Sequence, residues 1–75
     1  MNITDVMIHI NETLGEEARA SLEDKMRKIE GVISPKFNPG KEHLLMVAFD
    51  PDKTKALVLL DQARAAGYTA QLVSM

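Results

Sequence analysis

The longest apolar run in the chain, Leu44-Leu45-Met46-Val47-Ala48-Phe49, constrains the fold more than any other feature. It closes at Asp50-Pro51, and its β-favouring residues together with this proline favour a strand over a fragment of helix. Residues 45, 47 and 49 alternate with residues 44, 46 and 48, so both faces of the strand are apolar. Both helical patterns of the sequence lie outside this run. We therefore interpret it as a central strand of a sheet.

Length and composition limit what the rest of the chain can be. Its 75 residues suffice for one domain with one small core. Nine Lys and Arg against eleven Asp and Glu give a net charge of -2 with mixed signs, which does not support binding of nucleic acid or of an anionic membrane. The absence of cysteine excludes disulfides and thiolate chemistry. No apolar run has the roughly 18 residues of a membrane span and no basic secretory signal opens the chain, so we expect a cytoplasmic protein.

The first half of the chain predicts a strand followed by a helix. Residues 3–10 alternate between apolar and polar with a period of two, which is typical of a half-buried strand. Thr13 followed by Glu16 matches a capping box, so we expect a helix that starts near Gly15. Its apolar residues recur at helical spacing, and the helix should end at about Glu30, before a glycine that favours a left-handed cap.

The second half predicts a hairpin, a second helix and a last strand. Residues 32–37 form a strand that Pro35 restricts to a sheet edge, because proline cannot donate to a ladder. Residues 38–41, Asn-Pro-Gly-Lys, match a type II turn that joins this strand to the central one. Thr54 is the expected N-cap of a helix that ends at the next glycine. Residues 68–73 then form the last strand.

The element order is strand, helix, strand, strand, helix, strand. Two βαβ units of similar length joined by a hairpin make the split-βαβ, ferredoxin-like plan, an α+β fold. Right-handed crossovers place both helices on one face of a four-stranded antiparallel sheet. The expected strand order is 4-1-3-2, which puts the first and third strands in the centre.

The sequence resembles the heavy-metal-associated domain family. The resemblance rests on Val47-Ala48-Phe49-Asp50-Pro51, on Ala66-Gly67-Tyr68-Thr69-Ala70 after the second helix, and on Gly31-Val32 after the first. It covers nearly the whole chain and implies a single domain over residues 1–75. The family comprises copper and mercury chaperones and the N-terminal domains of metal-transporting P-type ATPases. It holds its metal with two cysteines of a Met-x-Cys-x-x-Cys loop between the first strand and the first helix.

The resemblance places Gly15 and Ala18 at the two cysteine positions. Neither side chain binds a metal, whereas the family chemistry needs two thiolates at the start of a helix. The resemblance therefore implies the family fold with a degenerate metal site, and we expect no cofactor. Thr13, Glu16 and Tyr68 are the residues expected to support the loop.

Other metal ligands are an alternative. Met7, His9 and Met46 are expected on one face of neighbouring strands, where thioether and imidazole groups suit copper. The competing interpretation is ordinary packing of methionine on a sheet. Oxygen ligands near the loop suit a harder cation, although acidic residues in a first helical turn commonly serve the helix dipole. These oxygen ligands belong to Asn11, Glu12, Glu16 and Glu17, and zinc is a further candidate metal.

The second histidine, His43, is expected on the other side of the alternation from Met46. We therefore leave it out of the soft-ligand cluster and expect that the two histidines do not act together.

The sheet face opposite the helices is expected to be apolar enough to bind a protein. Such a patch exceeds what a monomer normally exposes, unless the register is off by one residue. A protein partner or a second copy of the chain is expected at this face or at the Pro35 edge. The residues of the face are Met7, Ile33, Leu44, Met46, Ala48 and Val73.

The function expected from the sequence is that of a small non-enzymatic binding protein acting by protein contact. The alternative is a copper-type carrier or sensor with Met/His or carboxylate ligands. RNA binding is disfavoured, because Phe49 should face the helices and the charge is slightly acidic. An enzyme is disfavoured because neither a catalytic triad nor a phosphate-binding glycine loop is recognisable.

Overall fold

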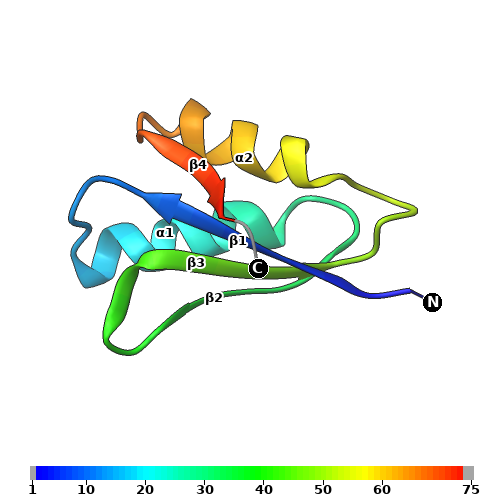
Figure 1. Ribbon diagram of the computed structural model, residues 1–75, viewed down its shortest axis with the longest axis horizontal. Helices are drawn as coiled ribbons and strands as arrows, with labels where there is room; N and C mark the ends of the chain where they lie inside the picture. The colour runs from blue at the N-terminus through cyan, green and yellow to red at the C-terminus, as the bar shows by residue number, and fades with distance from the viewer. Residues whose placement is uncertain (1, 74–75) are drawn as a thin grey trace.

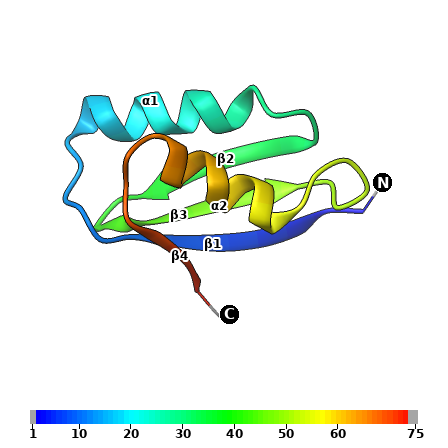
Figure 2. The ribbon, with the colours of Figure 1, turned by 90° about the horizontal axis from the view of Figure 1, so that it is seen from above.

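The computed structural model describes residues 2–73, and it contains the six expected elements in the expected order (Figure 1). The strands form one antiparallel sheet in the order β2-β3-β1-β4, which confirms the 4-1-3-2 order and the α+β, ferredoxin-like plan. Figure 2 shows both helices on the same side of the sheet. The elements are β1 (Thr4–Ile10), α1 (Glu16–Arg27), β2 (Val32–Asn38), β3 (Lys41–Phe49), α2 (Ala56–Ala65) and β4 (Ala70–Val73).

The core lies between the sheet and the two helices. Alternating residues of β1 and β3 point into it, and the pairing of Ile8 with Leu45 and of Val6 with Val47 keeps these apolar side chains in register. The helices contribute one apolar stripe each, as their spacing predicts. The central side chains of this core are Ile8, Ile10, Leu22, Met26, Leu45, Val47, Phe49, Leu59, Leu60 and Ala63.

The β2 edge is protected from pairing with another strand. Pro35 has no N–H to offer, which explains why β2 lies at the edge as predicted. The backbone N–H of Phe37 donates to Glu23 Oε2 of α1 at 2.8 Å, so a further edge donor is occupied. Register irregularities at both ends of β2 disturb the ladder further. Strand addition at this edge is therefore disfavoured.

The first helix starts near Gly15 as expected, but the N-caps lie two residues after Thr13 in α1 and one residue after Thr54 in α2. Gly15, not Thr13, is the N-cap of α1, and its extended backbone makes no side-chain cap bond. The reason is that Leu14 is buried in the core, which leaves Thr13 exposed and outside the helix. In α2 the N-cap is Lys55, because Thr54 is itself buried. Both capping predictions were therefore wrong.

The predicted end of the first helix and the predicted start of the last strand each made the element too long. The first helix ends at Arg27 rather than near Glu30, because the chain tightens into turns in which Ile29 N–H donates to the Met26 carbonyl. The last strand begins at Ala70 rather than at Tyr68.

Candidate functional site

Three connections meet at one end of the sheet (Figure 1). They are the β1–α1 loop at residues 11–15, the β2–β3 hairpin around Pro39-Gly40, and the α2–β4 link at residues 66–69. The N–H of Asn11 donates to the Thr69 carbonyl at 2.9 Å and joins the first connection to the third. The loop that the resemblance associates with metal binding is therefore held in place by backbone contacts.

Glu12 ties the same two connections together through its carboxylate. The Thr69 N–H donates to Glu12 Oε1 at 2.9 Å and to Oε2 at 3.1 Å. This bond, aided by the N–H of Glu12 itself, holds the pKa of the carboxyl below its ordinary value of 4.5. Because Glu12 serves the loop and Asn11 Oδ1 accepts from Gln71, two of the four expected oxygen ligands are already engaged.

The two positions that the resemblance assigns to the metal-binding cysteines lie at the start of α1. Gly15 is the N-cap and Ala18 stands in the first turn, so both are near the positive end of the helix dipole. Arg19 Nη1 donates to the Leu14 carbonyl at 2.6 Å and fixes the loop just before the helix. Both positions are thus at a helix start, but neither side chain carries a donor atom. These residues do not fit a metal ion.

The three predicted loop-supporting residues have different surroundings. Thr13 is exposed and caps nothing, and Glu16 is the first residue of α1. Tyr68 is half-buried against the core. Glu12, Arg19 and Thr69 make the hydrogen bonds that hold the loop. No sequence motif singled out Arg19, and Thr69 entered only as part of a segment that carries the resemblance.

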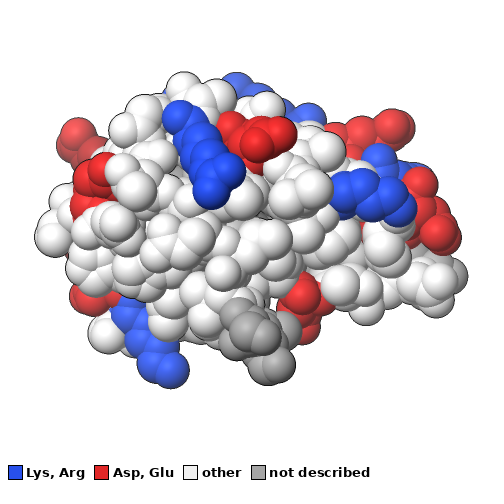
Figure 3. All heavy atoms as spheres, turned by 45° about the horizontal axis from the view of Figure 1, so that its top comes forward, with Lys and Arg blue, Asp and Glu red and all other residues white. Residues whose placement is uncertain are grey.

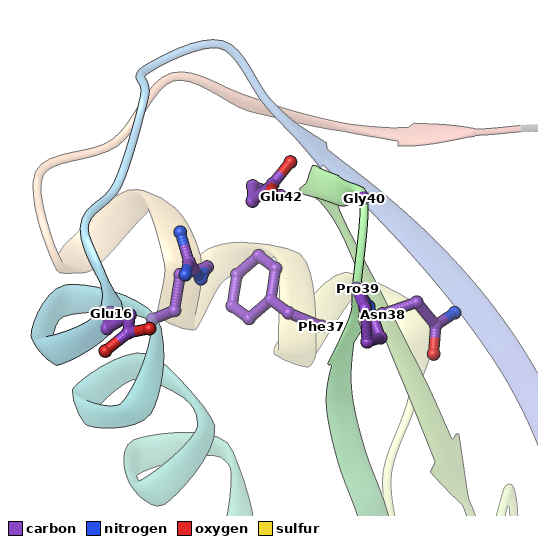
Figure 4. Close-up of a pocket in the computed structure, with 7 residues that line it drawn as sticks. Glu16, Phe37, Asn38, Pro39, Gly40 and Glu42 are labelled. Carbon is purple, nitrogen blue, oxygen red and sulfur yellow. The ribbon is translucent and has the colours of Figure 1, made fainter.

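A shallow cavity of about 350 Å³ lies between the start of α1 and the β2–β3 hairpin. Figure 4 shows Phe37 pointing from β2 toward α1, while Asn38 points away. Glu16 and Glu42 flank the opening, and the remaining lining comes from Arg19, Pro39 and Gly40. The carboxylates stand on different elements, and this hollow offers no nucleophile beside a base.

The open sheet face gathers the predicted apolar residues. Met7 lies directly opposite Met46 on β3 and Val73 on β4. Leu44 and Ala48 lie on the same side, and each of these five side chains is half-buried. Ile33 sits in the irregular part of β2, without a β3 partner, and is 45% exposed.

The rings of the two histidines are in contact, although alternation predicts that His9 and His43 lie on opposite sides of the sheet. Their rings are stacked with centroids 5.8 Å apart and planes inclined by 19°. His43 Nδ1 donates to the Ile10 carbonyl at 2.7 Å. The physical reason is that the hydrogen bond to the Ile10 carbonyl holds the His43 ring at the end of β1, next to His9.

The remaining surface is mixed in charge, and the face seen in Figure 3 interleaves basic and acidic side chains around a wide uncharged area. Within the part of the chain that the structure describes, no helix has the length and apolar character to cross a membrane. Large apolar side chains are also exposed at Ile3 before β1, at Leu57 and Val58 of α2, and at Leu72 of β4.

No family model matches the sequence, and no curated protein matches it. Solved structures do. Oxidized MerP from Ralstonia metallidurans CH34 matches with a TM-score of 0.84 at 19% identity, over 97% of this chain and 100% of that chain. The N-terminal domain of a potential copper-translocating P-type ATPase from Bacillus subtilis, in its Cu(I)-loaded state, matches at 0.84 and 21%, over 95% and 88%. A copper-binding domain from HMA7, a P-type ATPase, matches at 0.83 and 17%, over 93% of each chain.

At sequence identities this low, the high TM-scores establish that the chain shares the fold of these structures. The chain has the fold of the heavy-metal-associated domains, and the resemblance read from the sequence is confirmed at that level.

The expectation that the chain has no cofactor was wrong, because the structures that share its fold include copper-binding domains and therefore point toward metal. Metal binding at the β1–α1 loop is disfavoured, because the two cysteines that bind metal in the family are absent from this chain. Across residues 2–73, no group of three or more His, Asp or Glu is arranged to hold a metal ion.

Proposed function

We propose that this chain is a non-enzymatic binding domain that works by contact with a protein through its open sheet face. The observation that carries the proposal is the uncovered face around Met7 and Met46, where five apolar side chains stand together with no helix over them (Figure 2). Contiguous apolar patches of this kind commonly mark interaction sites. The protected β2 edge argues against the alternative contact at Pro35.

Lack of enzymatic activity is part of the proposal. The cavity beside α1 is lined by two carboxylates, an arginine and hairpin residues, and these do not form a nucleophile–base–oxyanion arrangement.

The test uses a charge placed in the centre of the face. Met46→Lys should abolish the contact, because burying an ammonium group against apolar side chains is unfavourable. Leu57→Lys is the matched control, since Leu57 is 64% exposed on α2, away from the sheet face. Sedimentation velocity over a concentration series tests a second copy as the partner, and capture from a native lysate tests other proteins. A strict monomer that captures nothing dependent on Met46 would contradict the proposal.

The second candidate function is a copper-type carrier or sensor that uses Met7, His9 and Met46. The register supports it, because Met7 faces Met46 across the β1–β3 ladder and His9 is on the same side of β1. Thioether and imidazole ligands suit Cu(I). The combined change Met7→Leu and His9→Gln should then abolish Cu(I) binding, and unchanged affinity would eliminate this site. The cytoplasmic location stays a prediction, which cell fractionation tests.

A further inference from the structure

A backbone carbonyl fixes the tautomer of the His43 ring. Its Nδ1 lies 2.7 Å from the Ile10 carbonyl oxygen, which can only accept, so Nδ1 carries the ring proton. In a neutral ring the lone pair is then on Nε2. A backbone carbonyl at Nδ1 is the arrangement that fixes tautomer and orientation in histidines that bind metals through Nε2.

His9 has a comparable partner on the other side of the pair. Gln71 Nε2 lies 2.9 Å from His9 Nδ1 and 3.2 Å from Asn11 Oδ1. In this arrangement the Gln71 amide donates to His9 Nδ1. A half-turn of the Gln71 amide together with that of Asn11 presents the Gln71 oxygen to His9 and the Asn11 NH₂ to that oxygen, so that Nδ1–H donates and Nε2 becomes the ligand atom. Gln71 can therefore support either tautomer of His9.

We propose that His9 and His43 form a two-imidazole site for a borderline divalent metal ion, with Cu²⁺ bound more tightly than Zn²⁺. The ring centroids are 5.8 Å apart with planes inclined by 19°, and each ring has its Nδ1 engaged by the protein. Binding one ion through both Nε2 atoms requires the His9 ring to turn about its side-chain torsions toward His43. Imidazole nitrogen suits both ions, and Cu²⁺ precedes Zn²⁺ in the general affinity order. Water completes the coordination, since residues 2–73 supply no cluster of three His, Asp or Glu.

This site differs from the family loop, because it lies at the end of β1 and β3 rather than at Gly15 and Ala18. It goes beyond the proposed protein contact and does not depend on it.

The experiment is a titration of the untagged protein with Zn²⁺, followed by the imidazole C–H signals in NMR, and with Cu²⁺, followed by electron paramagnetic resonance. Both imidazoles should shift together and saturate at one Zn²⁺ per chain. The Cu²⁺ spectrum should show two nitrogen ligands from imidazole. This wild-type measurement decides the proposal without any variant, and it is made at a concentration where sedimentation finds monomer. Shifts of neither ring, or of one ring alone, would overturn it.

Substitutions then separate this site from the soft cluster. His9→Gln and His43→Gln should each lower Zn²⁺ affinity more than about tenfold, and Gln71→Leu should lower it by about tenfold through loss of ring orientation. The double variant Met7→Leu and Met46→Leu keeps the apolar face, and its Zn²⁺ affinity should be unchanged. If the methionine changes abolish binding while His43→Gln does not, the metal belongs to the methionine cluster and the two-histidine site is wrong. His9→Gln decides if the His43 variant fails to fold.

Discussion

Glu12 is the residue whose charge most clearly holds the loop end together. Its carboxylate accepts the Thr69 N–H across 57 positions of sequence, and this lowers its pKa. A group with a lowered folded-state pKa stabilises the fold above its unfolded pKa, and that stabilisation disappears as the pH falls through the folded value.

We therefore predict that Glu12→Gln destabilises the domain at pH 7 and that the difference from wild type vanishes in acid. The decrease should occur below the ordinary carboxyl pKa of 4.5, because the folded value is lower still. Urea unfolding at pH 7 and at successively lower pH measures it. Glu30→Gln, which removes an exposed charge from the turn after α1, is the control. A pH-independent difference for Glu12→Gln would contradict the assignment.

Gly31 and Gly67 form a matched pair of left-handed glycines. Their φ angles are 97° and 99°, but a Cβ on Gly31 would meet Lys53 Cβ at 2.7 Å, whereas a Cβ on Gly67 would meet nothing within 4 Å. Gly67→Ala should cost about 1–2 kcal/mol from backbone strain alone. Gly31→Ala should cost clearly more, since strain and clash combine. Equal losses in urea unfolding would show that the close approach of the two loops is unimportant.

Residue-level features were the hardest to predict from sequence. The Thr13–Glu16 pattern has the spacing of a capping box, but the burial of Leu14 decides where the helix begins. The His9–His43 contact depends on where two strands end, and alternation alone assigned the rings to opposite sides. In contrast, Gly15 and Ala18 were placed at the helix start by the resemblance, and the structure locates them there.

The elements were predictable wherever a periodicity or a proline determined them. The apolar residues of α2 recur at helical spacing, at positions 56, 59, 60, 63 and 66, and the structure buries three of these and packs the other two against the core. Pro35 correctly indicated an edge strand. The irregularity around Ile33 was not predictable, because no sequence signal marks a bulge of this kind.

Two leucines test whether one face of α2 is buried and the other is exposed. Leu59 is fully buried and Leu57 is 64% exposed. Leu59→Ala should lower the free energy of unfolding by about 2–5 kcal/mol, because it leaves a cavity in the core. Leu57→Ala should stay within about 0.5 kcal/mol of wild type. Chemical denaturation of both variants measures this, and a similar loss in both would mean that the helix is packed differently.

For the whole molecule, the sequence predicted the architecture because local signals and global topology agree. The central run at residues 44–49, the edge proline and the two helical stripes are compatible with one strand order, and that order is observed. The function was less predictable than the fold, because the positions that the resemblance assigns to the metal-binding cysteines hold Gly15 and Ala18. The two binding surfaces that we propose, a sheet face and a histidine pair, are defined by tertiary contacts rather than by a motif.

The central claim is that this domain keeps the heavy-metal-associated fold, including the helix start of the metal loop, and lacks only the ligands there. The most direct test is an amide-resolved Cu(I) titration of wild type and of the double variant Gly15→Cys, Ala18→Cys. Gly15 has an extended backbone and free space for a Cβ, so a side chain there should not disturb the fold. The variant should bind one Cu(I) tightly, with shifts confined to residues 11–19, and wild type should show no such shifts. A folded double variant without loop binding would contradict the account.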